Sequence, residues 1–86
     1  MSLIWHDNAW EDYLWFQAND QRLLKRVNLL IREIRRDPVE GIDKPEVLRE
    51  ELSGWMSRRI DSEHRLVYRV RNGNIEIAQC RYHYTK

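Results

Sequence analysis

Apolar residues recur through the first forty positions at the spacing of α-helices. One set follows an i, i+3, i+4, i+7 pattern that puts every member on a single helix face: Leu23, Leu24, Val27, Leu30, Ile31 and Ile34. This second helix ends near Arg35 and Arg36, which suit the negative end of a helix dipole, and Pro38 stops it. A first helix is predicted from Asp7, a capping residue, with apolar members at helical spacing: Trp10, Tyr13 and Leu14.

Extended segments surround these helices. Leu3-Ile4-Trp5 predicts a short strand, and three further strands are predicted over residues 54–60, 65–71 and 74–82. Asn72-Gly73 between two alternating runs indicates a tight hairpin. Residues 37–51 hold both prolines, which favours a loop with a short helical piece around residues 46–51. The order β-α-α-β-β-β predicts an α+β fold, in which two N-terminal helices pack on one face of a small antiparallel sheet.

The hairpin separates the side chains of the last two strands onto two faces. The apolar face, suited to the helices, holds Leu66, Tyr68, Val70, Ile75 and Ile77. The opposite face holds Arg65, Arg69, Arg71, Glu76, Cys80, Tyr82 and Tyr84. A basic and aromatic open face is suited to RNA, because bases stack on Tyr and phosphates pair with Arg. The alternative is a polar outer face with ion pairs such as Arg69 with Glu76.

The distribution of charge along the chain bears on RNA binding more than the net charge does. The 86 residues form one domain, 1–86, with one small core, and their formal net charge is +1. Residues 1–21 carry four acids and no Lys or Arg, whereas residues 52–86 carry seven bases and three acids. Taken alone, the near-neutral net charge argues against a nucleic-acid binder. It averages an acidic N-terminal segment with a basic C-terminal segment that is rich in arginine.

Several classes of site are excluded by spacing. His6, His64, His83 and Cys80 lack any paired metal-ligand spacing, so no metal is expected. Three scattered glycines provide no phosphate-binding loop, and there is no nucleophile elbow. No cofactor, signal peptide or membrane span is expected. A lone cysteine excludes an internal disulfide and is typical of a reducing cytoplasm.

Blocks along the whole chain resemble one family. They are Trp10-Glu11-Asp12-Tyr13-Leu14, Lys44-Pro45-Glu46, Leu52-Ser53-Gly54, Ser57-Arg58-Arg59-Ile60, Glu63-His64-Arg65-Leu66-Val67-Tyr68 and Cys80-Arg81-Tyr82-His83-Tyr84. From about Leu3 to Tyr84 the chain resembles the YoeB toxins, which belong to the RelE/ParE superfamily of toxin–antitoxin systems. The resemblance implies a RelE-like fold and a cytoplasmic toxin. Such toxins are endoribonucleases that cut mRNA in the ribosomal A site and are neutralised by a YefM antitoxin.

The resemblance also assigns roles to residues. Glu46 matches the general base, His83 the general acid, Arg65 the arginine that stabilises the phosphate, and Tyr84 the terminal tyrosine needed for activity. Further contacts to the substrate and its phosphates are expected from Arg49, Arg59, Lys44 and Arg81. The expected partners are a YefM-like antitoxin, the ribosome with its mRNA, and RNA; a homodimer is one further candidate assembly.

Two alternatives and one conflict remain at this point. A ParE-like toxin of similar fold would inhibit a protein target such as gyrase without cutting nucleic acid, and a degenerate binding module would only occupy the ribosome or an antitoxin. The conflict is geometric, because strict alternation puts His83 on the sheet face opposite Arg65 and Tyr84. We therefore expect the last strand to be irregular, with a bulge between Ile77 and His83 or a departure from the sheet after Cys80.

Overall fold

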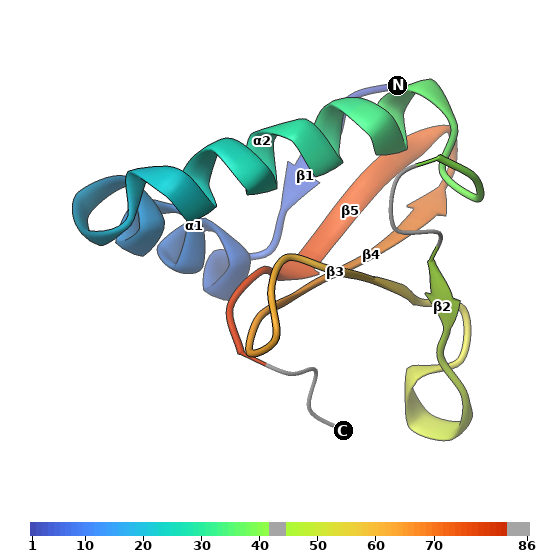
Figure 1. Cartoon of the computed structure of the whole chain (residues 1–86). Coiled ribbons are helices and arrows are strands. Elements are labelled where there is room, and N and C mark those ends of the chain that lie inside the picture. Colours follow the sequence, from blue (N-terminus) through green and yellow to red (C-terminus); the bar gives the residue numbers. More distant parts are fainter. Residues whose placement is uncertain (42–44, 83–86) are drawn as a thin grey trace.

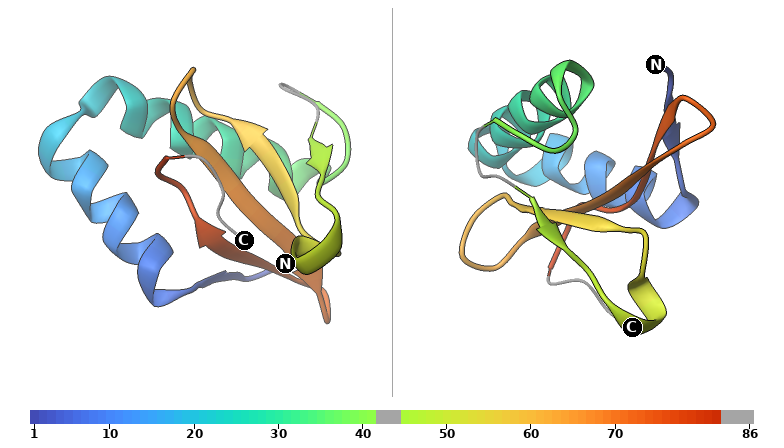
Figure 2. Two further views of the ribbon diagram at one scale, coloured as in Figure 1. Left: turned by 90° about the horizontal axis from the view of Figure 1, so that it is seen from below. Right: turned by 90° about the vertical axis from the view of Figure 1, so that its right-hand side faces the viewer.

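A computed structural model describes residues 1–41 and 45–82 of the chain. Its elements follow in the order β1 (Leu3–Trp5), α1 (Asp7–Asn19), α2 (Gln21–Arg36), β2 (Glu46–Val47), the 3-10 helix η1 (Glu50–Leu52), β3 (Met56–Arg59), β4 (Arg65–Arg71) and β5 (Asn74–Gln79). The strands form one sheet in the order β1-β5-β4-β3-β2. Both helices lie on one side of this sheet, whereas β2 and η1 extend toward the other side (Figures 1 and 2). The predicted α+β class is confirmed.

The helices form where their local signals predict them. Asp20 ends α1 and caps α2, because its Oδ1 accepts a hydrogen bond from the N–H of Leu23 at 3.0 Å. Apolar residues of both helices and of the sheet make one core, with fully buried members that include Ala9, Phe16, Val27, Leu30, Ile34, Leu66, Tyr68, Ile75 and Ile77. In the described part of the chain, no helix is long and apolar enough to cross a membrane.

The sheet departs from the sequence prediction at both edges. β1 pairs with β5 in parallel, so the sheet is mixed rather than wholly antiparallel. A three-residue strand pattern carries no information about direction, which explains the difference. Glu46–Val47 form a short strand against β3, and the helical piece expected there begins only at Glu50. The antiparallel pairing of β3, β4 and β5 is as predicted.

A β-bulge interrupts the last strand. Tyr68 pairs with Ile77 and Val67 with Gln79, so Ala78 is an extra residue on β5. An extra residue reverses the alternation of faces beyond it, and Cys80 is consequently buried in the core, which corrects its predicted place on the open face. β5 also ends at Gln79, earlier than predicted. The expected irregularity of this strand is confirmed. Val70 corrects a further prediction, because at 39% exposure it lies outside the core.

Candidate functional site

Several of the sequence-predicted site residues lie on the sheet face that the helices leave uncovered. The pairing register aligns Glu46 of β2 with Ser57 of β3, and two residues further along β3 it sets Arg59 opposite Arg65 of β4. Side chains two residues apart in a strand point to the same face, so Ser57 and Arg59 share one. Three sequence-predicted residues, Glu46, Arg59 and Arg65, therefore lie on the same side of the sheet.

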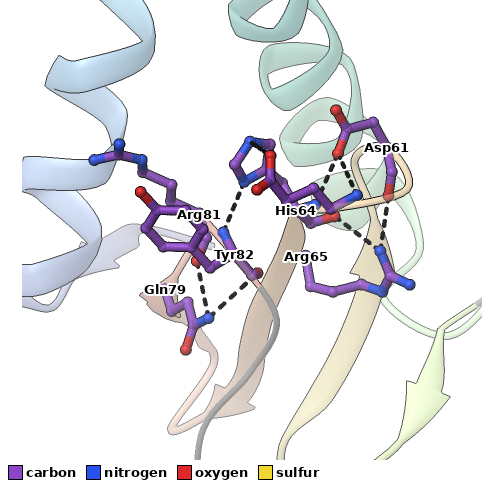
Figure 3. Close-up of polar contacts among 7 residues, drawn as sticks. Asp61, His64, Arg65, Gln79, Arg81 and Tyr82 are labelled. Carbon is purple, nitrogen blue, oxygen red and sulfur yellow. Dashed lines mark hydrogen bonds and ion pairs between the residues drawn. The ribbon is translucent and has the colours of Figure 1, made fainter.

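The Arg65 guanidinium is held in place by hydrogen bonds from one of its nitrogens, Nη1. Its Nη1 donates to the main-chain oxygens of Asp61 at 2.7 Å and His64 at 3.1 Å, both in the turn between β3 and β4 (Figure 3). Within residues 1–41 and 45–82, nothing accepts a hydrogen bond from its Nε or Nη2. The half-buried side chain thus has a fixed orientation and leaves donors for a planar, bidentate contact with a phosphate.

Two other arginines of this face are engaged by a carboxylate. Arg69 and Arg71 both bond to Glu76, with N–O distances of 3.0 Å and 3.1 Å, and the predicted pair of Arg69 with Glu76 is confirmed. His6 Nε2 lies 3.2 Å from the same carboxylate. The hydrogen bond with His6, followed by that with Arg69, holds the pKa of Glu76 below its ordinary value. Arg59 and Arg65 are therefore the arginines of this face that are best placed to bind a phosphate.

A buried arginine and a tyrosine hold the loop between α2 and β2. Arg58, 1% exposed, donates through Nη2 to the main-chain oxygens of Asp37 at 3.1 Å and Glu40 at 2.8 Å, and through Nε to the Tyr68 hydroxyl at 3.0 Å. The hydroxyl donates in turn to the Pro38 oxygen at 2.6 Å. We call Arg58 and Tyr68 the loop anchor. It fixes the start of the connection that leads to Glu46.

A second group of contacts holds the end of the described chain. The N–H of Tyr82 donates to His64 Nδ1 at 2.7 Å (Figure 3). The carbonyl of Tyr82 accepts from the N–H of Arg65 at 2.9 Å. Gln79 Nε2 donates to the carbonyls of Arg81 at 2.9 Å and Tyr82 at 3.4 Å. We call His64, Gln79 and the Arg65 amide the C-terminal anchor. This anchor holds Tyr82, the residue before His83, beside Arg65.

Cys80, which lies between the bulge and the C-terminal anchor, is hydrogen-bonded to α1. The N–H of Cys80 donates to Asp12 Oδ2 at 3.1 Å, and burial raises the pKa of Asp12, although the Cys80 bond and the nearby charge of Arg81 oppose that shift. Burial, reinforced by Asp12, also raises the pKa of the Cys80 thiol. A buried thiol that stays protonated is not a nucleophile, so Cys80 has a structural role.

The remaining predicted residues lie elsewhere. Arg49 is exposed and immediately precedes η1. Arg81 points toward α1, where its Cζ lies 3.7 Å from the centroid of a Trp15 ring. Lys44, His83 and Tyr84 lie outside the described residues. Among the residues that are described, no group of three His, Cys, Asp or Glu side chains could hold a metal ion.

Sequence reasoning missed the residues of the two anchors. Arg58 had a usable signal, because strand alternation aligns it with Leu66 on the apolar face, and a charged residue there needs buried partners. His64 had a weaker signal, its place directly before Arg65. Gln79 had none, because its role depends on the bulge at Ala78.

Comparisons with known proteins agree on one family. A family model described as the YoeB-like toxin of bacterial type II toxin–antitoxin systems matches residues 5–84. The toxin YoeB of a Synechocystis species is 55% identical over 86 residues, covering 100% of both chains. A YoeB/ParE toxin structure from Agrobacterium tumefaciens has a TM-score of 0.94 and 44% identity, covering 98% of this chain and 100% of that one.

Two further structures come from Staphylococcus aureus. A heterotetrameric YoeB–YefM toxin–antitoxin complex and a YoeB dimer each match with a TM-score of 0.89 and 47% identity, covering 98% of both chains. The toxin–antitoxin complex RelBE2 of Mycobacterium tuberculosis, at 22% identity and a TM-score of 0.70 over 95% of this chain and 96% of that one, shares the fold. The RelE-like architecture expected from the sequence is thereby confirmed.

Proposed function

The chain belongs to the YoeB-like toxins of bacterial type II toxin–antitoxin systems, and from this premise we propose that it is a ribosome-dependent endoribonuclease that cleaves mRNA in the ribosomal A site. Such cleavage would inhibit translation. The observation that carries the proposal is the arrangement around Arg65. Its guanidinium is oriented by one edge, Arg59 lies opposite, Glu46 is on the same face, and the C-terminal segment is attached to the Arg65 amide.

The proposed reaction begins with the RNA's own 2′-OH. Glu46 removes its proton as the oxygen attacks the neighbouring phosphorus, and a positioned general base typically contributes about 10²–10⁴-fold. Arg65 stabilises the negative charge that grows on the phosphorane oxygens, usually the largest single contribution. Because the nucleophile belongs to the substrate, the chemistry needs no metal or cofactor.

His83 completes the proposed reaction as general acid. It protonates the departing 5′-oxygen, which leaves a 2′,3′-cyclic phosphate and a 5′-OH end, while Tyr84 helps to position the substrate. The assignment is supported by the C-terminal anchor. His83 directly follows Tyr82, whose main chain hydrogen-bonds to His64 and to Arg65, the residue proposed to bind the phosphate. Consecutive Cα atoms are about 3.8 Å apart, which limits how far the acid can lie from that point.

Other residues are proposed to bind the RNA backbone. Arg49 and Arg59 are both exposed, and with Lys44 they would contact phosphates that flank the scissile bond. Arg81 belongs to the same proposed set, although its guanidinium lies over the rings of Trp15 on α1 and of Tyr82. The near-neutral net charge of +1 suits an enzyme to which the ribosome presents the RNA, since long-range attraction is then not required.

The cell biology of the proposal follows from the relatives. The Staphylococcus aureus relative forms both a complex with YefM and a dimer, and we propose that this chain also binds a YefM-like antitoxin and forms a homodimer in the cytoplasm. An acidic antitoxin segment that orders on binding would complement the Arg59 and Arg65 surface. Size-exclusion chromatography with light scattering, with and without a co-expressed antitoxin, tests both assemblies.

Programmed ribosomes test the nuclease activity. Wild type should cleave A-site mRNA, and Glu46→Gln, Arg65→Lys and His83→Gln should each slow single-turnover cleavage by at least about 10²-fold. Arg71→Lys is the matched control, because Arg71 is an arginine of the same face that pairs with Glu76, and its variant should cleave at the wild-type rate.

Two results would contradict the proposal. One is cleavage that survives the Glu46 and His83 substitutions, and the other is a folded wild-type protein that leaves the mRNA intact. In the second case a gyrase inhibition assay decides whether the chain is instead a ParE-like toxin that acts on a protein target without cutting nucleic acid.

A further inference from the structure

Tyr82 adopts a backbone conformation that its own side chain does not favour. Its φ is +63°, in the left-handed region where the Cβ of an L-residue is crowded by the backbone. The side chain is 51% exposed, so burial does not explain the conformation. Such residues persist only where the surrounding structure holds them, and they concentrate at functional sites.

His64 supplies the contact that holds the N–H of this residue. His64 is 4% exposed, with its ring edge-on to Phe16 at 5.3 Å between centroids. Nδ1 accepts the Tyr82 N–H at 2.7 Å, which requires Nδ1 to be unprotonated. Nε2 lies 3.3 Å from a carboxylate oxygen of Glu63, a partner that favours a proton on Nε2. The ring is thus fixed in both orientation and tautomer.

The turn before β4 positions the His64 main chain as well. Asp61 Oδ1 accepts the N–H of His64 at 2.7 Å, and the His64 carbonyl accepts from Arg65 Nη1 at 3.1 Å. One short turn therefore orients the Arg65 guanidinium through its carbonyls and Tyr82 through an imidazole (Figure 3). These contacts couple the phosphate-binding side chain to the segment that leads to His83.

We propose that His64 is a positioning residue for the cleavage reaction, which sets the conformation of Tyr82 through Nδ1 and thereby aligns the following residues with Arg65. This inference rests on the proposed nuclease function. It assigns to His64 no contact with the substrate: the residue acts through the N–H of Tyr82. Misplacement of a reacting group by about 1 Å can cost about 10²-fold in rate, so the expected effect is large.

Two substitutions of the same chemical type separate positioning from packing. In His64→Asn the amide oxygen lies near the place of Nδ1 and can still accept the Tyr82 N–H, whereas in His64→Gln the oxygen lies near the place of Nε2 and cannot. Single-turnover cleavage on programmed ribosomes should be slowed by about 10²-fold in His64→Gln and restored to within about tenfold of wild type in His64→Asn. Half-saturating ribosome concentrations should be unchanged in both.

Amide hydrogen exchange of Tyr82, followed by NMR, gives a readout that does not depend on activity. Exchange should be faster in His64→Gln and close to wild type in His64→Asn; His6→Gln, a histidine change at the Glu76 network, should alter neither exchange nor cleavage. Equal cleavage rates, or equal Tyr82 exchange, in the Asn and Gln variants would overturn the inference. If wild type cleaves no mRNA, the nuclease proposal fails, while the exchange experiment still decides whether His64 holds Tyr82.

Discussion

Two buried polar residues, Arg58 and His64, hold the two segments that lead into the proposed site, and they do so in opposite ways. Arg58 is a donor in the middle of β3, and its guanidinium hydrogen-bonds to oxygens in the loop after α2 and to the Tyr68 hydroxyl of β4. His64 is an acceptor in a turn, and its Nδ1 holds the N–H of Tyr82. The first anchor therefore has more buried partners to lose than the second.

The difference teaches how this small domain separates stability from function. Loss of Arg58 removes a donor from the buried Tyr68 hydroxyl and from two part-buried main-chain oxygens, so its effect should spread to the core. Loss of the His64 acceptor removes one bond to an exposed residue, so its effect should remain local and appear in the reaction. Substitutions in the two anchors should therefore differ in how far they lower the free energy of unfolding.

Arg58→Met should be the most damaging change. Methionine fills a similar volume but donates nothing to Asp37, Glu40 or Tyr68, and each unsatisfied buried group costs about 1–3 kcal/mol. The free energy of unfolding in urea should fall by at least about 3 kcal/mol, and Tm by about 12 °C or more. Arg59→Met, which changes the exposed neighbour, should stay within about 0.5 kcal/mol. A loss below about 1 kcal/mol for Arg58→Met would show that the loop anchor is not a stability element.

Tyr68→Phe should cost less, about 1–3 kcal/mol, because it removes only the hydroxyl between Arg58 and Pro38. Burial raises the pKa of this phenol, although the Arg58 bond opposes the shift, so the hydroxyl remains a donor at neutral pH. A double-mutant cycle with Arg58→Met isolates the coupling, which should exceed about 0.5 kcal/mol. Strict additivity would mean that the two side chains hold the loop independently.

The sequence predicted the layers of the fold better than the site. Helical spacing and the Asn72-Gly73 turn locate α2, β4 and β5 because both signals are local. Pairing between distant strands is not local, and for that reason the parallel direction of β1 and the short strand at Glu46 could not be read from the pattern. The same limit applies to the bulge, which no motif marks.

At the site, alternation correctly grouped Arg65 with Arg69 and Glu76 but misplaced Cys80. A single extra residue, Ala78, accounts for the error, because it reverses the alternation of faces at the end of β5. The conflict between His83 and Arg65 was visible in the sequence and correctly indicated an irregular strand. What could not be foreseen was the means of fixing the segment, since His64 and Tyr82 are distant in sequence and meet only through the turn and the bulge.

Asp61→Ala tests whether the C-terminal anchor depends on its turn. Asp61 Oδ1 accepts the N–H groups of Glu63 at 2.9 Å and His64 at 2.7 Å, and its loss should cost about 1 kcal/mol, as for a helix cap. Asp61→Asn keeps an acceptor and should lose less. Urea unfolding measures both variants, and faster exchange of the His64 amide should accompany the alanine change. If Asp61→Ala destabilises as strongly as Arg58→Met, the two anchors do not differ as described.

Glu76→Gln should have the smallest effect, and one that depends on pH. Two of the three partners of the carboxylate are solvent-exposed, His6 at 41% and Arg71 at 59%, and such pairs contribute little; glutamine also keeps an oxygen that can accept from Arg69. Its folded-state pKa lies below the ordinary 4.5, so the unfolded chain binds more protons in that range. The stabilisation is therefore complete above about pH 4.5 and is lost as pH falls through the folded-state value. Between pH 6 and pH 3 the Tm of wild type should consequently fall further than the Tm of Glu76→Gln. The control Glu11→Gln on α1 should follow wild type. Parallel curves of Tm against pH for all three proteins would exclude Glu76 as a source of acid sensitivity.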